Sequence, residues 1–310
     1  MEPMPERWSE VREHLLPVVR GICRPPGSLT RMNTDPSRAP IRRPLAPFLS
    51  ELVVVDGEMT RQYVTPRQLE QWGVDAHRVF HAARGNLAPT EGLGRVGDFF
   101  ALAAGDGYDS SRLVLPGWLE AFSGLVQGVP VVAAPDARSL LVCDSADEDA
   151  VAALAARAFE GYRQAGDPVS PGLYARVDGD LVPYLVSSGP LAALLRRNQL
   201  VLAGQQYRLQ QQELESEIRL GDFTVYAGPG FAVSMCRVVL GQPCAVPVVD
   251  VVLLESEDGQ LKTVEWPHVL AASEGEPLAE LVPPRFAWRG LSCAFSDLPE
   301  APFQLTPRQA

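Results

Sequence analysis

The segment Gly105–Arg112 carries the residue types best suited to chemistry, two aspartates and an arginine close together. It reads Gly-Asp-Gly-Tyr-Asp-Ser-Ser-Arg and lies between a predicted strand, residues 97–104, and a predicted helix. Two neighbouring carboxylates can act as acid and base, or can hold a hard cation such as Mg²⁺. Asp106, Asp109 and Arg112 are therefore candidate catalytic residues of a hydrolase or transferase, and the two aspartates are the residues that would hold a divalent cation.

An anion or nucleotide site is a second interpretation of the same segment, because backbone N–H groups at a helix start can hold a phosphate. The two aspartates argue against it, since they would repel an anion. Candidate ligand-binding residues are the polar and turn-forming residues here and in two neighbouring segments: Asn86, Gly105, Gly107, Tyr108, Ser110, Asp136 and Arg138.

A purely structural role is the third interpretation, and it is the commoner use of these residue types. Gly105 and Gly107 would adopt positive φ, Asp109 or Ser110 would cap the helix, and Arg112 would pair with Asp109. Helix caps and turns use the same residues as this kind of site, so the sequence leaves the choice open.

His77 and His81 stand four residues apart on one predicted helix, a spacing at which two imidazoles can share a metal. The intervening residues are Arg-Val-Phe, so the glutamate of an H-E-x-x-H motif is missing, and no third ligand is close in sequence. We therefore expect ordinary surface or packing histidines.

Several familiar catalytic and cofactor motifs are absent. No G-x-S-x-G occurs, and the single lysine, Lys262, falls in a predicted strand, which excludes Walker-type NTPases and protein kinases. Gly92–Gly97 matches G-x-G-x-x-G, but it precedes a strand, whereas a dinucleotide site needs it after one. No cofactor is predicted, and Mg²⁺ is kept only as a possibility at the aspartates.

Composition indicates a globular protein. The chain has 310 residues, a formal charge of −11 and 46% hydrophobic residues, enough apolar surface for a core. The acidic balance argues against nucleic acid as a partner, and no apolar run is long enough to span a membrane. Five cysteines without a C-x-x-C pair are typical of free thiols in a reducing compartment, so we expect a cytoplasmic protein.

The charge is unevenly distributed. Residues 1–47 form a predicted Pro/Arg-rich arm with eight arginines and five acidic residues, so its charge is positive while the rest is strongly negative. The arm could bind an acidic partner or lie across the chain's own acidic surface, and we expect the second. The positions that test this expectation are Arg31, Arg38, Arg42 and Arg43.

The predicted fold class is α+β, in two domains with a seam near Gly166–Pro171. Residues 48–165 predict a mixed sheet with helices. Residues 166–310 predict a β-hairpin-rich domain with a long polar helix at 190–220, whose narrow apolar stripe suggests docking by one face. Turn signals such as Asp178-Gly179 mark the hairpins.

Several stretches together carry a family resemblance. They are Pro44–Asp56, the helix end at Arg84–Leu87, the Gly105–Leu113 segment, Val129–Pro135 and Ser139–Cys143. In this order they resemble the domain-of-unknown-function family 1444, the YtpQ-like bacterial proteins, over about residues 44–165. The resemblance implies a soluble cytoplasmic α+β protein and no particular reaction.

We therefore predict a non-enzymatic binding or accessory protein, because no complete catalytic constellation is present in the sequence. A protein partner is possible, but neither its identity nor the oligomeric state follows from the sequence. The hydrolase or transferase at Asp106, Asp109 and Arg112 is the alternative, and anion or nucleotide binding at Gly105–Ser111 is the third.

Overall fold

The computed structural model describes residues 4–22, 37, 39–57, 60–87, 93–102, 104–214, 219–278 and 281–302. These residues form an α+β fold with four sheets and two compact units. The described residues up to Val186, apart from Ile22, belong to the first unit, and those from Ser187 onward belong to the second. The sequence placed the seam earlier, at Gly166–Pro171.

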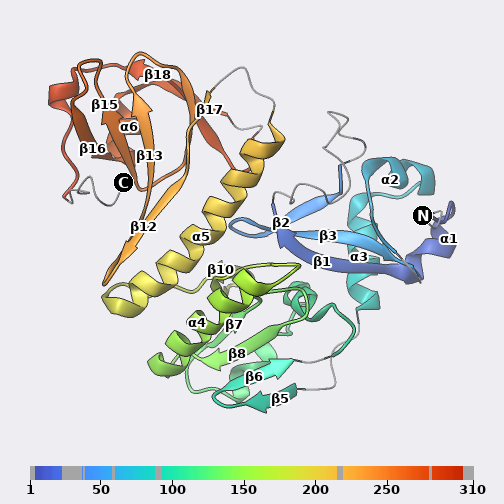
Figure 1. The fold of residues 1–310 in the computed structure, drawn as a ribbon. Coiled ribbons are helices and arrows are strands. Elements are labelled where there is room, and N and C mark those ends of the chain that lie inside the picture. Colours follow the sequence, from blue (N-terminus) through green and yellow to red (C-terminus); the bar gives the residue numbers. More distant parts are fainter. Residues whose placement is uncertain are drawn as a thin grey trace. The chain divides into compact units, whose positions relative to one another are not determined.

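The first sheet of the first unit is antiparallel in the order β1-β3-β2, and β4 also pairs with β3 (Figure 1). The strands are β1 (Leu15–Gly21), β2 (Arg42–Ala46), β3 (Leu49–Asp56) and β4 (Arg61–Tyr63). Strand β3 is buried almost throughout because it lies between two partners and is rich in Val and Leu. Strands β1 and β2 come from the predicted arm, so these parts of it are integral to the first unit.

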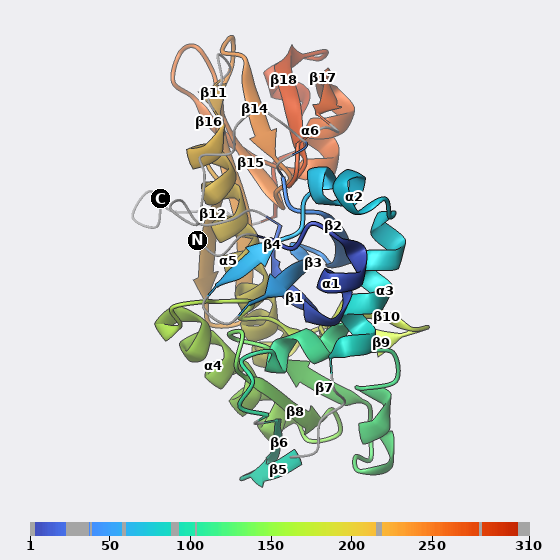
Figure 2. The same ribbon diagram turned by 90° about the vertical axis from the view of Figure 1, so that its right-hand side faces the viewer.

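Helices cover one face of this sheet, as Figure 2 shows for α3. The helices are α1 (Trp8–Val11), η1 (Arg12–His14), α2 (Pro66–Trp72) and α3 (Ala76–Asn86). Val79 and Phe80 of α3 pack with Leu15, Val53 and Val55 of the sheet. Thr65 and Gly73 bound α2 as the sequence predicts, and Asp75 caps α3. Helix α1 and η1 together span only Trp8–His14, because the chain enters β1 at Leu15.

The second sheet has six antiparallel strands in the order β10-β9-β7-β8-β6-β5 (Figure 1). They are β5 (Leu93–Val96), β6 (Phe99–Leu102), β7 (Pro130–Ala133), β8 (Leu140–Asp144), β9 (Leu173–Val177) and β10 (Asp180–Pro183). Because β9 pairs with β7, the chain beyond Gly166 still belongs to this unit, which explains the later boundary. Helix α4 (Glu148–Gln164) packs on β7 and β8, with Asp147 as its cap.

The second unit begins with the long helix α5 (Gly189–Glu213). One sheet has the order β11-β14-β18-β17 and the other the order β12-β13-β15-β16. The strands are β11 (Arg219–Leu220), β12 (Thr224–Gly228), β13 (Phe231–Val239), β14 (Cys244–Pro247), β15 (Val251–Glu255), β16 (Leu261–Glu265), β17 (Ser273–Leu278) and β18 (Arg285–Leu291). A short helix, α6 (Trp266–Ala272), and the turn η5 (Phe295–Asp297) complete it.

The long helix differs from the sequence prediction in its end and its surface. It ends at Glu213, and residues 219–220 form a strand. Gln206 and Gln210, expected on a solvated face, are buried. Gln210 Nε2 donates to the Pro283 carbonyl at 2.6 Å, so at least this glutamine is buried because it has a hydrogen-bond partner inside the second unit.

Candidate functional site

The Gly105–Arg112 segment forms a tight turn followed by η3 (Asp109–Val114). Gly105 and Gly107 have φ of 74° and 78°, the left-handed region that glycine tolerates. The predicted helix is a six-residue 3₁₀ helix, and neither Asp109 nor Ser110, the two predicted caps, caps it. Asp109 Oδ1 instead accepts from the Ala104 amide at 2.9 Å, which closes the turn.

Asp106 and Arg112 form a two-pronged ion pair, with Nη2–Oδ2 at 2.6 Å and Nη1–Oδ1 at 3.2 Å. The Arg112 side chain is 2% exposed and the Asp106 side chain 40%. Burial alone would raise the pKa of Asp106, but hydrogen bonds from Arg112 and the Tyr108 amide outweigh it and hold that pKa below its ordinary value. Asp106 is thus a charged partner for a buried guanidinium.

Asp109 is buried in the same cluster, with its Oδ1 4.0 Å from Arg112 Nη1. Burial raises the pKa of Asp109, and the charges of Asp106 and Asp136 raise it further, while the Ala104 amide and Arg112 oppose them. The predicted pairing of Arg112 with Asp109 is therefore present but secondary, since the short contacts go to Asp106.

Tyr108 anchors the segment on the first sheet, on the face opposite α3. Its ring packs with Val18, Leu52 and Val54, and the Arg61 guanidinium lies 4.3 Å from the ring centroid. Burial and the neighbouring Asp56 raise the pKa of Tyr108 above its ordinary value. This environment indicates a packing role for the aromatic ring.

The remaining candidate ligand residues serve turns and junctions. Ser110 is buried and its amide donates to the Ala137 carbonyl at 3.2 Å. Asp136 accepts from the Arg138 amide and from the Ser139 hydroxyl, both at 2.7 Å, while Arg138 itself is exposed. Asn86 donates to the carbonyls of Arg12 and Leu15, so it joins the end of α3 to the start of β1.

No metal site emerges from the part of the chain that the structure describes. Within it, no group of three or more His, Cys, Asp or Glu side chains could hold an ion. His77 and His81 are exposed on α3, with parallel rings whose centroids lie 6.5 Å apart. A third protein ligand for them is missing from the same described residues.

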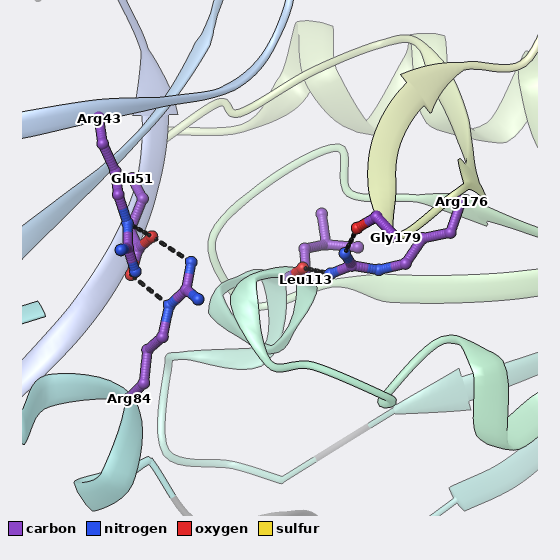
Figure 3. Close-up of polar contacts among 6 residues, drawn as sticks. All are labelled: Arg43, Glu51, Arg84, Leu113, Arg176 and Gly179. Atoms are coloured by element: carbon purple, nitrogen blue, oxygen red, sulfur yellow. Dashed lines mark hydrogen bonds and ion pairs between the residues drawn. The ribbon is translucent and has the colours of Figure 1, made fainter. Parts of the chain in front are cut away.

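Sequence reasoning missed a buried ion-pair cluster on the first sheet (Figure 3). Glu51 of β3 is 1% exposed, and arginines from β2 and α3 approach its carboxylate. Arg43 Nη2 lies 3.1 Å from Oε1, and Arg84 donates to both oxygens at 3.0 and 2.7 Å. Residues 43, 51 and 84 are distant in sequence, and the only local signal is that Glu51 directly precedes the apolar run Leu52–Val55.

A second feature in Figure 3 is Arg176 of β9, which makes two backbone contacts. It donates to the carbonyl of Leu113, at the end of η3, and to the carbonyl of Gly179, in the β9–β10 turn, both at 2.6 Å. The hairpin turn and the acidic segment are therefore connected through one guanidinium.

The arm residues can be assigned in part. Arg43 pairs with Glu51, and Arg20 Nη2 lies 2.7 Å from Asp167 Oδ2, so both arginines contact acids of the chain's own first unit. Arg42 lies in β2, where it is exposed. Arg31 and Arg38 lie outside the described residues, and the arm as a whole stays a prediction.

An open cavity of about 750 Å³ adjoins the start of α4 in the first unit. Its charged lining is acidic apart from Arg95, and none of the Gly105–Arg112 residues belongs to it. Asp144 accepts from the amides of Gln127, Gly128 and Ala146, and these bonds outweigh the opposing effect of burial and lower its pKa. Asp144 thus organises a loop.

A groove of about 670 Å³ lies on the second unit, which the sequence did not single out. Its floor is one face of β12-β13-β15-β16, because most of its strand residues alternate with residues of the main core, such as Cys236 and Val252. The other walls come from β11, the following turn, and Glu300. The lining residues are Arg219, Leu220, Gly221, Asp222, Thr224, Tyr226, Met235, Arg237, Val238, Val239, Gln242, Cys244, Leu253, Leu261, Thr263 and Glu300.

A buried arginine, Arg285, hydrogen-bonds the backbone of one wall of this groove. Arg285 is 1% exposed, and its Nη1 donates to the carbonyls of Gly221 and Ala245 at 2.8 and 2.9 Å, while Nε donates to Gln210 Oε1 at 2.6 Å. Nη2 is buried without a hydrogen-bond partner. Burial lowers the pKa of Arg285, and electrostatic interactions with Tyr207 and Asp222 oppose that shift.

Comparison with known proteins provides no relative: no protein-family model, no curated protein and no solved structure matches the chain. The resemblance to family 1444 therefore stays a prediction. Among the described helices, none is both long and apolar enough to cross a membrane.

Proposed function

We propose that this protein works by binding a ligand and not by catalysis, and that the groove of the second unit is its binding site. The observation that carries the proposal is a contrast between two sets of polar groups: those of the Gly105–Arg112 segment bind one another, whereas those of the groove line an open volume. In the Gly105–Arg112 segment, which we call the acidic turn, Asp106 and Arg112 are bound to each other and Asp109 is buried. The Nη atoms of Arg112 and both Asp106 oxygens are thus used within the turn, which leaves little of this pair for a substrate.

The groove has the features that small-molecule sites share. Its volume falls within the range of about 300–1,000 Å³ typical of such sites. Leu253 and Leu261 offer apolar surface, and Thr224 and Tyr226 offer polar groups at its side. This mixture suits a ligand with an apolar body and a few polar atoms.

The hydrolase or transferase alternative has less support. A raised pKa at Asp109 suits an acid catalyst, but the side chain is 3% exposed and accepts from the Ala104 amide. The first unit's cavity near α4 does not include the acidic turn. The Mg²⁺ and nucleotide alternatives also have less support, because Arg112 already donates to both oxygens of the Asp106 carboxylate.

Binding of an uncharged fluorescent apolar probe, phenylnaphthylamine, tests the proposal. Leu261 lines the groove and is 57% exposed, so Leu261→Ala removes apolar contact without opening the core. We expect the dissociation constant to rise about fivefold, equivalent to about 1 kcal/mol of lost burial.

The matched control is Leu270→Ala, because Leu270 is an exposed leucine on α6 that does not line the groove. This variant should bind the probe like the parent protein. Equal affinities for all three proteins would refute the groove as the binding site.

A further inference from the structure

We propose that the groove of the second unit selects organic anions, with the anionic head beside Arg219 at the β11–β14 end and the apolar body on the sheet. This inference rests on the proposed function, since it names the ligand class of the same groove. It is carried by two guanidinium groups, Arg219 and Arg285, that no carboxylate of the described residues neutralises by direct contact.

Arg219 is the first of these groups. It lines the groove from β11, it is exposed, and its Nη1 donates to Gln242 Oε1 at 2.8 Å. No described acidic side chain forms an ion pair with it. An amide oxygen satisfies one donor of the five on a guanidinium, so most of its hydrogen-bonding capacity is available to a ligand.

Arg285 is the second. Its direct partners are two carbonyls and one amide oxygen, and Gly221, which accepts one of these bonds, belongs to the groove wall. A buried charge without a carboxylate partner is costly, because its field is poorly screened. Cys244, which lines the groove, lies close enough to sense both charges: burial raises the pKa of its thiol, and Arg219 and Arg285 oppose that rise.

The other charges of the groove define the orientation of the ligand. Arg237 is neutralised by Glu255, with Nε–Oε2 at 2.8 Å. Asp222 accepts from Gln211 Nε2 at 3.1 Å and acts through space on Arg285. Glu300 also lines the groove and precedes Ala301, whose amide donates to the Thr263 carbonyl of β16. The backbone at Glu300 therefore lies beside β16, whereas Arg219 lies on β11.

Two probes with nearly the same aromatic body isolate the charge. Anilinonaphthalene sulfonate carries a sulfonate, and phenylnaphthylamine does not. For the full-length parent protein we expect the sulfonate to bind more tightly, and its affinity to fall as salt rises from about 50 to 300 mM, because an exposed charge pair is screened. The affinity for phenylnaphthylamine should be insensitive to salt.

Arg219→Gln is the decisive variant. It should weaken sulfonate binding about tenfold, through loss of a charge-assisted hydrogen bond, and leave phenylnaphthylamine binding within about twofold. Arg208→Gln is the matched control, because Arg208 is an exposed arginine on α5 that hydrogen-bonds Gln205 and does not line the groove. It should leave both affinities unchanged.

The outcomes separate the inference from the function on which it rests. If Leu261→Ala weakens both probes but Arg219→Gln changes neither, the groove binds ligands without anion selection and the inference is wrong. If Arg219→Gln and Arg208→Gln weaken the sulfonate equally, the effect is general charge and the inference is also wrong. If Leu261→Ala changes neither probe, the proposed function itself fails. Thermal unfolding of each variant shows whether it is folded.

Discussion

The acidic turn of the first unit and the groove of the second both combine arginines with carboxylates, yet they use them differently. In the turn, Arg112 is buried and bound by two prongs to Asp106. In the groove, Arg219 is exposed, and among the described residues its side chain hydrogen-bonds only an amide oxygen. The lesson is that residue types and spacing identify polar clusters, whereas the available hydrogen-bonding capacity decides whether a cluster can bind something else.

The largest expected effect is in the turn. Arg112→Ala should lower the free energy of unfolding by about 3 kcal/mol, because it leaves Asp106 and the buried Asp109 without their cation. Urea denaturation followed by circular dichroism measures the change. If the variant is as stable as the parent, the cluster is not structural, and the comparison between turn and groove loses its basis.

A smaller effect is the pH dependence of stability, to which Asp106 and Asp109 contribute with opposite signs. The pKa of Asp106 is lowered on folding, so its contribution to stability exists above the ordinary value of 3.8 and is lost as pH falls through the folded pKa. The pKa of Asp109 is raised on folding, so its charge costs stability at neutral pH, and this cost disappears as pH falls through the raised pKa.

Asn replacements should therefore act in opposite directions. At pH 7, Asp106→Asn should destabilise by less than about 1 kcal/mol, because solvent screens this partly exposed group. Asp109→Asn should stabilise by up to about 1 kcal/mol, since the amide oxygen still accepts from the Ala104 amide. Both differences should vanish well below pH 3.8 in the same denaturation assay. Effects of the same sign at pH 7 would contradict the assignment.

The smallest effects belong to the groove. Arg219→Gln and Leu261→Ala should change the free energy of unfolding by less than about 0.5 kcal/mol, because both side chains are exposed. Calorimetry of the two variants checks this. A loss of stability comparable to that of Arg112→Ala would assign Arg219 a structural role and would weaken its assignment to ligand binding.

Local signals in the sequence predicted much of the fold. The turn at Asp178-Gly179, with φ of 52° and 87°, joins β9 and β10, and Asp258-Gly259 joins β15 and β16 as expected. Asp147 caps α4 where the apolar period predicts a helix. Each of these features depends on a few consecutive residues, which is the range over which turn and capping preferences operate.

Long-range pairing could not be predicted in the same way. Strand β13 pairs in parallel with β15, and β14 lies between them in the chain but in the other sheet. Strand β1 joins β3 across a segment rich in proline and arginine. The region after Ser273, without clear periodicity in sequence, supplies β17 and β18. Partner choice depends on the whole core and is not encoded in neighbouring residues.

For the site, the sequence identified the acidic turn and its internal Asp–Arg pairing, but assigned the main contact to Asp109 when it goes to Asp106. The groove was missed because its lining comes from six strands and their connections. Arg285 had one available signal, an arginine beginning the otherwise apolar Arg-Phe-Ala-Trp run. Such an arginine suggests a buried charge, although its partners become visible only in three dimensions.

The two backbone contacts of Arg176 have a consequence for how the first unit opens. Its guanidinium donates to the Leu113 carbonyl, near the end of η3, and to the Gly179 carbonyl, in the turn of the β9–β10 hairpin. We expect segments connected in this way to exchange their amide protons together, as the contiguous cooperative units of proteins do. The amides of the acidic turn and of a hairpin more than sixty residues away in sequence should thus exchange at the rate of one shared opening.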